Sequence, residues 1–142
     1  MKTTYTFDDL LWDKRSATKP GSFSVPLKED PDISISVKQI PQLLHRYATL
    51  SSFVFYNSYS EITKLEHETT LLSRLDQNSN FVIKYYGKHI DSEYYYIFTE
   101  YGNYGDFNTL LKPELSYSEK EIWIYLTSVA LGLNSLICLG LF

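Results

Sequence analysis

Three charged side chains stand in patterns that could support chemistry. Lys38 lies in residues 33–40, where alternating apolar and polar residues predict a strand with the lysine on its polar face. Glu68 falls on a predicted helix, and Asp106 precedes another. An ammonium group can bind phosphate oxygens, and a carboxylate can orient an ammonium or accept hydrogen bonds. Each residue also has a purely structural interpretation: a solvated lysine, a glutamate paired with Lys64, and a helix N-cap.

The cysteine and the histidines do not suggest a metal site or a nucleophile. Cys138 has no partner for an internal disulfide, and we expect it to be a small buried apolar residue. His45, His67 and His89 lack the spacing of a zinc site, and we expect them to be structural or on the surface.

The composition is that of one folded domain. Its 142 residues and 16.6 kDa suit a single core, and 44% apolar with 21% charged residues argue against wholesale disorder. Thirteen basic against seventeen acidic residues give a net charge of −4, which argues against non-specific nucleic-acid binding. With one cysteine and no apolar stretch at the N-terminus, we expect a cytoplasmic protein without a signal peptide.

Regular structure is predicted mainly from the strand at 33–40 onward. Residues 1–32 are polar and interrupted by Pro and Gly turns, so we expect irregular chain with short strands at best. Residues 42–57 fit neither the helical nor the strand period. The sequence Ser58-Tyr59-Ser60-Glu61 has the form of a capping box, and apolar residues at helical spacing predict a helix over 60–76.

The rest of the chain predicts a hairpin and two more helices. Aromatic and β-branched runs at 81–88 and 94–101 predict antiparallel strands. Asp106 is expected to cap a short helix through Lys112, and a capping box at Ser118 begins a long helix without charges from residue 122 on. This mixture of strands and helices places the chain in the α+β class.

Four motifs, in order along the chain, carry a family resemblance. They are Glu68-Thr69-Thr70-Leu71-Leu72, Phe81-Val82-Ile83-Lys84-Tyr85-Tyr86, Tyr96-Ile97-Phe98-Thr99-Glu100-Tyr101-Gly102-Asn103-Tyr104-Gly105-Asp106-Phe107, and residues 122–142. Their order and spacing resemble serine/threonine protein kinases, most closely those of the NIMA-related kind. The resemblance implies a kinase-like N-lobe, a twisted antiparallel sheet with one regulatory helix, followed by the hinge and the first long helix of the C-lobe.

The resemblance assigns roles around ATP to residues of the N-lobe. Lys38 would hold the nucleotide phosphates and pair with Glu68, while Ser36 shares the cofactor-binding face of the strand. Gly21 would be the one glycine kept from a glycine-rich phosphate loop, in the degenerate sequence Lys19-Pro20-Gly21-Ser22-Phe23-Ser24. Read alone, Pro20-Gly21 predicts a turn.

The hinge is the most specific part of the resemblance. Thr99 would be the gatekeeper at the back of the adenine pocket. The Glu100 carbonyl and the Gly102 amide would hydrogen-bond the adenine edge, and Asp106 would accept from a ribose hydroxyl. Backbone groups at a strand end suit this role because they are free to pair with a planar heterocycle.

The resemblance divides residues 1–142 into three parts of one partial kinase domain. Residues 1–32 form the degenerate glycine-loop region, 33–101 the N-lobe strands and regulatory helix, and 102–142 the hinge and first C-lobe helices. The catalytic loop and the Asp-Phe-Gly segment would follow Phe142. We therefore expect no catalytic residue in this chain and no kinase activity from it alone, with magnesium bound only in a complete kinase.

Two alternatives remain open from the sequence. The chain could be a non-catalytic kinase-like interaction module, in which the exposed side of the last helix binds a protein partner or a second copy. Residues 122–142 are also long enough to anchor a protein in a membrane, but Thr127, Ser128, Asn134 and Ser135 interrupt the run. A protein substrate or protein partner is expected in preference to a membrane.

Overall fold

A five-stranded antiparallel sheet forms the centre of the molecule. The computed structural model describes residues 2–42, 52–75, 79–112 and 115–141. The strands follow the spatial order β1-β2-β3-β5-β4, and every neighbouring pair is antiparallel. They are β1 (Ser16–Lys19), β2 (Ser22–Pro26), β3 (Ser34–Pro41), β4 (Tyr85–Ile90) and β5 (Tyr94–Glu100). Together with the helices, this sheet confirms the α+β class.

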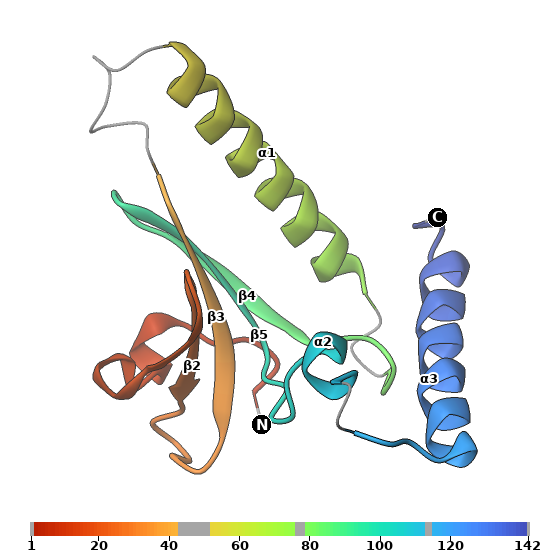
Figure 1. Ribbon diagram of the computed structural model, residues 1–142. Coiled ribbons are helices and arrows are strands. Elements are labelled where there is room, and N and C mark those ends of the chain that lie inside the picture. Colours follow the sequence, from red (N-terminus) through yellow and green to blue (C-terminus); the bar gives the residue numbers. More distant parts are fainter. Residues whose placement is uncertain (1, 43–51, 76–78, 113–114, 142) are drawn as a thin grey trace.

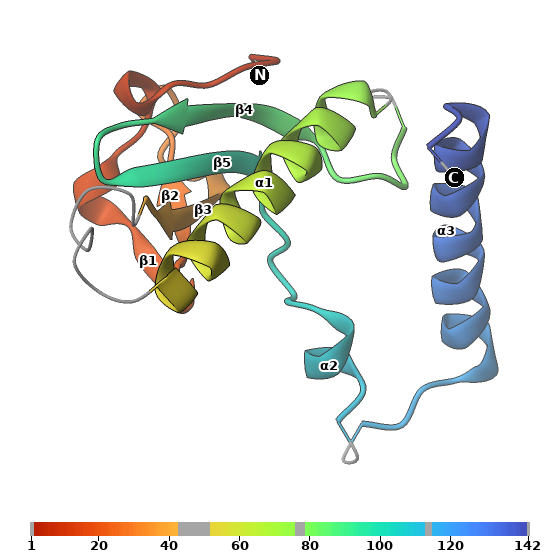
Figure 2. The same cartoon turned by 90° about the horizontal axis from the view of Figure 1, so that it is seen from above.

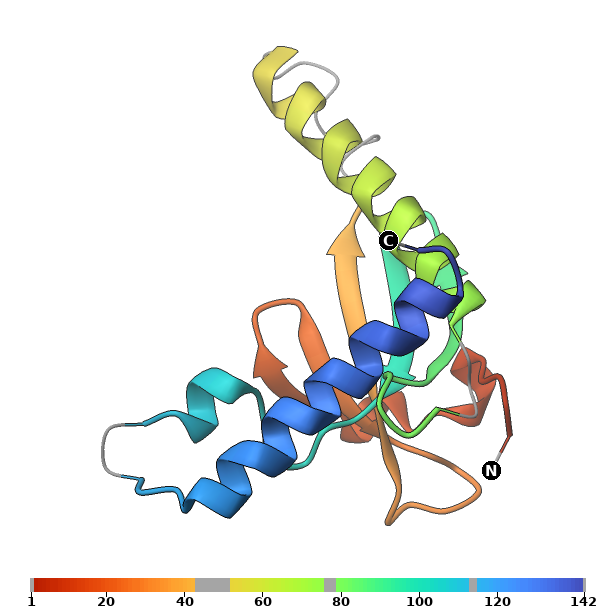
Figure 3. The ribbon, with the colours of Figure 1, turned by 90° about the vertical axis from the view of Figure 1, so that its right-hand side faces the viewer.

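Helix α1 crosses one face of the sheet, and α3 stands at the side of the molecule away from β1 and β2 (Figures 1 and 2). Figure 3 shows α2 next to the N-terminal end of α3. The helices are η1 (Phe7–Asp9), η2 (Trp12–Lys14), α1 (Ser52–Arg74), α2 (Phe107–Leu110) and α3 (Glu119–Cys138).

The alternation in β3 sorts its residues between the two faces of the sheet. Ile35 and Val37 are fully buried on the face that we call the outer face, whereas Lys38 is exposed on the opposite, α1 face. The strand predicted at 33–40 is thus confirmed to within one residue at each end. The buried side chains of the outer face are Tyr5, Leu10, Val25, Leu27, Ile35, Val37, Tyr86, Tyr96 and Phe98, and those of the α1 face are Leu65, Tyr95 and Ile97.

The N-terminal segment covers the outer face, which its polar composition did not predict. Tyr5 and Leu10 are buried against the sheet, and Leu10 forms a bridge with Leu27. Phe7 contacts Trp12 and Phe98 edge-to-face, with ring centroids 5.1 and 5.5 Å apart. The expectation of irregular chain over 1–32 was therefore only partly right, because a few large apolar residues anchor this segment in the core.

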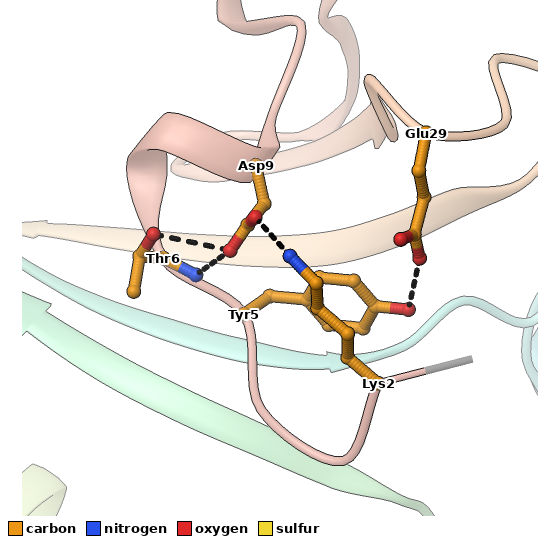
Figure 4. A network of polar contacts seen from close by, with 5 residues as sticks. All are labelled: Lys2, Tyr5, Thr6, Asp9 and Glu29. Atoms are coloured by element: carbon orange, nitrogen blue, oxygen red, sulfur yellow. Dashed lines mark hydrogen bonds and ion pairs between the residues drawn. The ribbon is translucent and has the colours of Figure 1, made fainter.

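Polar contacts fasten the same segment at its start (Figure 4). The Tyr5 amide donates to the carbonyl of Tyr86, 3.0 Å away, and the Tyr5 hydroxyl donates to Glu29 at 3.2 Å. Asp9 accepts from Lys2 at 2.6 Å and from the Thr6 amide at 2.9 Å. The Lys2 ammonium and the Thr6 amide lower the pKa of Asp9 to about 2, since both stabilise its charged form.

Helix α1 begins earlier than the sequence predicted. It starts at Ser52, so the Ser58-Tyr59-Ser60-Glu61 motif lies inside the helix and not at its N-terminus. The capping-box motif does not fix where this helix begins, because a serine inside a helix costs only about a few tenths of a kcal/mol relative to alanine. Most of the open stretch 42–57 and part of the expected turn at 76–80 lie outside the described residues.

The hairpin and the two C-terminal helix starts agree with the sequence. Strands β4 and β5 pair antiparallel, although β4 begins at Tyr85, four residues later than predicted, and residues 79–84 form a loop. The Asp106 side chain caps α2, and Ser118 forms the expected capping box of α3 with Glu121. Helix α2 ends at Leu110, two residues early, and α3 ends at Cys138, ahead of a left-handed Gly140.

Helix α3 is apolar but largely exposed within the described chain. Among its residues with described side chains only Gly132 is buried, and Trp123, Ile124, Leu126 and Ile137 are more than half exposed. Cys138 is exposed too, which corrects the expectation that it is buried, because an apolar composition does not by itself bury the side chains of a helix. By length and composition α3 could cross a membrane, and it is the one such helix in the described residues.

Candidate functional site

The predicted site residues on the sheet form two cross-strand rows. In one row Ser36 of β3 stands between Ser24 of β2 and Thr99 of β5. In the other, Lys38 stands between Ser22 and Ile97. Directly opposite residues of antiparallel strands share a face, and Ile97 packs with Leu65 of α1. Ser36, Lys38 and Thr99 therefore all project from the α1 face.

Lys38 and Glu68 form an ion pair between β3 and α1. The Lys38 Nζ lies 3.0 Å from Oε2 and 3.4 Å from Oε1 of Glu68, although thirty positions separate the two residues. Both side chains are 45% exposed, so solvent screens the pair and its contribution to stability is at most about 1 kcal/mol. What the contact does is hold the ammonium at a defined place on the α1 face.

Packing and one buried polar contact place Glu68 beside the sheet. Leu65 is buried with Tyr95 and Ile97 one turn before Glu68. Thr69 is the one buried polar residue in the described chain, and its hydroxyl donates to the Glu66 carbonyl at 3.0 Å. The Tyr95 hydroxyl, 3.2 Å from the Thr69 Oγ1, can then act as donor to it. These contacts anchor the turn of α1 that carries Glu68.

The chain after β5 includes a backbone donor without a partner among the described residues. The Gly102 carbonyl accepts from the Gly105 amide at 3.3 Å, which closes a turn. The Gly102 amide donates to no acceptor within the described residues. The Glu100 amide is bonded to the Lys84 carbonyl at 2.9 Å, and the Glu100 side chain accepts from the Lys84 amide at 3.3 Å. The end of β5 is thereby tied to the loop before β4.

Asp106 binds a lysine that the sequence did not single out. Its Oδ2 lies 2.5 Å from the Lys19 Nζ, at the end of β1, and its Oδ1 accepts from the amide and the hydroxyl of Thr109, both at 3.0 Å. These donors, the Lys19 ammonium first, lower the pKa of Asp106 to about 2. The helix cap predicted for Asp106 is thus present through Oδ1, while Oδ2 binds Lys19 of the β1–β2 hairpin.

Gly21 forms the turn between β1 and β2. Its φ of +72° lies in the left-handed region, and a Cβ there would stand 2.9 Å from the Gln39 carbonyl oxygen. The Gly21 carbonyl accepts from the Gln39 amide at 2.7 Å. The glycine is thus required by the turn and by its contact with β3, as the interpretation of Pro20-Gly21 as a turn predicts.

The structure brings the predicted residues together in two groups. Ser36, Lys38 and Thr99 lie on the α1 face next to Glu68, and Asp106 joins the segment after β5 to the β1–β2 hairpin. Lys19 was missed because nothing in the sequence links it to a carboxylate 87 positions away. Comparison with known protein families and with curated proteins finds no match to this chain.

Proposed function

We propose that this chain is the N-lobe, hinge and first C-lobe helices of a protein-kinase-like domain, and that it binds an adenine nucleotide. The observation that supports this most directly is the Lys38–Glu68 ion pair on the α1 face. It joins a central strand to α1, which crosses the sheet, and the family pairs a strand lysine with a helix glutamate in the same way.

The residues on the α1 face and at the hinge fit an adenine nucleotide. Lys38 offers an ammonium for phosphate oxygens, already oriented by Glu68. The Gly102 amide is without an acceptor in the described chain and can donate to the adenine edge, with the Glu100 carbonyl as its partner acceptor. Thr99 would close the back of this pocket, and Asp106 would accept from a ribose hydroxyl.

The proposal extends to the parent activity, which is ATP-dependent phosphorylation of serine or threonine in a protein substrate, in the cytoplasm. ATP supplies the phosphoryl group in that reaction, and magnesium belongs to the complete site. The groups that position magnesium and the attacking hydroxyl have no match in residues 1–142. For this chain the testable function is therefore nucleotide binding.

A thermal-shift titration with ATP, with and without magnesium, tests the proposal. A ligand that binds only the folded state at ten times its Kd stabilises the fold by about 1.4 kcal/mol and raises the Tm by several degrees, roughly. Lys38→Met and Gly102→Pro should each abolish most of this shift. Lys14→Met makes the same charge change in η2, on the segment that covers the outer face, and should keep it. No shift at about 10 mM nucleotide, or equal shifts in all four proteins, would refute nucleotide binding.

The exposed face of α3 supports a second candidate, an interaction module that acts without catalysis. An apolar cavity of about 300 Å³ lies between α2 and α3, lined only by apolar and tyrosine side chains. Its lining residues are Phe107, Leu110, Leu111, Tyr117, Ile122, Tyr125, Leu126 and Val129. Exposed apolar surface of this kind is typical of protein interfaces. Light scattering tests this candidate independently of the thermal-shift titration, because neither nucleotide binding nor association requires the other.

A further inference from the structure

We propose that the Lys19–Asp106 ion pair is a latch that closes the β1–β2 hairpin onto the hinge, and that a nucleotide exchanges it for a Lys19–phosphate contact. This inference rests on the proposed nucleotide site and adds to it a second phosphate-binding lysine. It also implies that, in the protein without nucleotide, Lys19 is already bound to Asp106.

The latch joins two parts of the fold that share few other described contacts. Lys19 is the last residue of β1, and Asp106 is the N-cap of α2, beyond the hinge. Their 2.5 Å contact spans 87 positions of sequence, and both side chains are partly exposed, 67% for Lys19 and 40% for Asp106. An exposed pair of this kind can exchange partners with little cost, because water and ions already compete for it.

Both carboxylate oxygens of Asp106 are engaged in the free protein. Oδ1 accepts from the amide and the hydroxyl of Thr109, and this bond holds the start of α2. Oδ2 faces Lys19. A ribose hydroxyl that approaches Asp106 therefore has to compete with the Lys19 ammonium at Oδ2, or break the helix cap.

Lys19 and Lys38 stand in one cross-strand row on the α1 face. Lys19 pairs with Ser22, and Ser22 pairs with Lys38. Because the two lysines lie two strands apart, their backbones are about 10 Å apart, and flexible side chains can bring both ammonium groups to one polyphosphate. Each lysine is held in the free protein by one carboxylate from outside the sheet, Asp106 or Glu68.

The tip of the hairpin gives a reason why a side-chain cation is needed there. Pro20, at this tip, has no amide to donate to an anion. A loop that binds phosphate through its backbone needs several free amides directed at the anion. In this hairpin the adjacent Lys19 can supply the positive charge that such amides would otherwise provide.

The exchange predicts that Lys19 acts in opposite directions on two ligands. Adenosine has to displace Lys19 from Asp106 and gives the lysine no new partner. ATP displaces it in the same way but offers the lysine phosphate oxygens. Lys19 should therefore weaken adenosine binding and strengthen ATP binding, so that it raises the preference for ATP over adenosine.

Isothermal titration of the 142-residue chain with adenosine and with ATP tests the exchange, in wild type and in Lys19→Met. We expect the ratio of the adenosine Kd to the ATP Kd to fall about tenfold or more in Lys19→Met, since a hydrogen bond between charged groups is lost only with ATP. Lys14→Met is the matched control and should leave the ratio unchanged.

The outcomes separate the latch from the nucleotide site. If Lys19→Met binds both ligands with the wild-type ratio, the latch is refuted and the nucleotide site stands. If the wild type binds neither ligand, the proposed function fails and the exchange fails with it. The ion pair is then judged without nucleotide: an NMR titration of the Asp106 carboxyl should show its pKa near 2 in wild type and higher in Lys19→Met, and an unchanged pKa would show that no latch exists.

Discussion

Gly132 of α3 lies against the backbone of Phe81, in the loop before β4. A Cβ on residue 132 would stand 2.8 Å from the Phe81 carbonyl oxygen, closer than folded proteins allow. Gly132 is also the one buried residue among the described side chains of α3. The helix is therefore positioned beside the sheet by a contact that only glycine permits.

Gly132→Ala should loosen α3 although alanine favours helices. The methyl group has to push the Phe81 backbone away, and crowding of this kind costs about 1–3 kcal/mol, which equals or exceeds the gain of about 1 kcal/mol in helix propensity. Hydrogen exchange should show faster exchange in α3 and in loop 79–84, with the sheet little changed. Asn134→Ala, at an exposed position of the same helix, should leave exchange unchanged or slower.

Thr69→Val should destabilise the protein by about 1–3 kcal/mol, because it leaves the buried Tyr95 hydroxyl without its partner. Urea denaturation measures the change in free energy of unfolding. Thr70→Val is a close control, since the Thr70 hydroxyl also donates to the Glu66 carbonyl but from an exposed position. The double variant Thr69→Val with Tyr95→Phe should cost less than the sum of the single variants, and strict additivity would show that the two hydroxyls do not interact.

The Asp9 carboxylate should make the fold sensitive to acid. Its pKa is lowered to about 2 in the folded protein, chiefly by the Lys2 hydrogen bond, against 3.8 ordinarily. Stability from this group is therefore present above about pH 4 and is lost as the pH falls toward 2. Asp9→Asn should unfold more easily than wild type at pH 7, and the difference should vanish near pH 2. Asp8→Asn makes the same charge change in the same turn, so equal behaviour of both variants would point to net charge instead.

Gly21→Ala should destabilise the β1–β2 hairpin. The position needs a left-handed backbone, and the added methyl group meets the Gln39 carbonyl at 2.9 Å. A loss of about 1–2 kcal/mol in urea denaturation is expected from the backbone conformation alone. Gly102→Ala is the control for stability, because a Cβ there meets only an ordinary contact at 3.9 Å. Equal losses in both variants would contradict a special role of the turn.

The purified chain should self-associate through α3. Exposed apolar residues line one helix that the described chain leaves uncovered, and dyes for apolar surface should bind it. Light scattering should show a molecular mass that rises with protein concentration. The double variant Trp123→Glu, Leu126→Glu should be a monomer. A monodisperse wild type without dye binding would refute this prediction.

If α3 instead anchors the protein in a membrane, carbonate should fail to extract the protein from cell membranes.

The sequence predicted those features that depend on local patterns. The alternation around Lys38 located β3, and the short side chains at Asp106 and Ser118 located two helix starts, because a cap is a contact within four residues. The approach of Lys38 to Glu68 was expected from the family resemblance and not from the pattern itself, since strand periodicity does not say which element faces the lysine.

The features that were missed depend on contacts distant in sequence. The N-terminal segment looked irregular because its anchors, such as Tyr5 and Leu10, are scattered among polar residues. The Lys19–Asp106 pair joins residues whose proximity follows only from the folded hairpin and hinge. The exposure of Cys138 could not be read from its apolar neighbours, because burial depends on what packs against a helix and not on the helix alone.

Helix α1 extends far beyond the residue that forms the ion pair with the sheet. Leu65 and Leu72 pack on the sheet near Glu68, and the helix starts at Ser52, about 24 Å along the axis from Glu68. A tilt of about 5° would therefore move the far end by about 2 Å. Conversely, a force applied at that end would tilt the helix and move the Glu68 carboxylate relative to the Lys38 ammonium. The ion pair could then be made or broken from a site about 24 Å away along the helix axis.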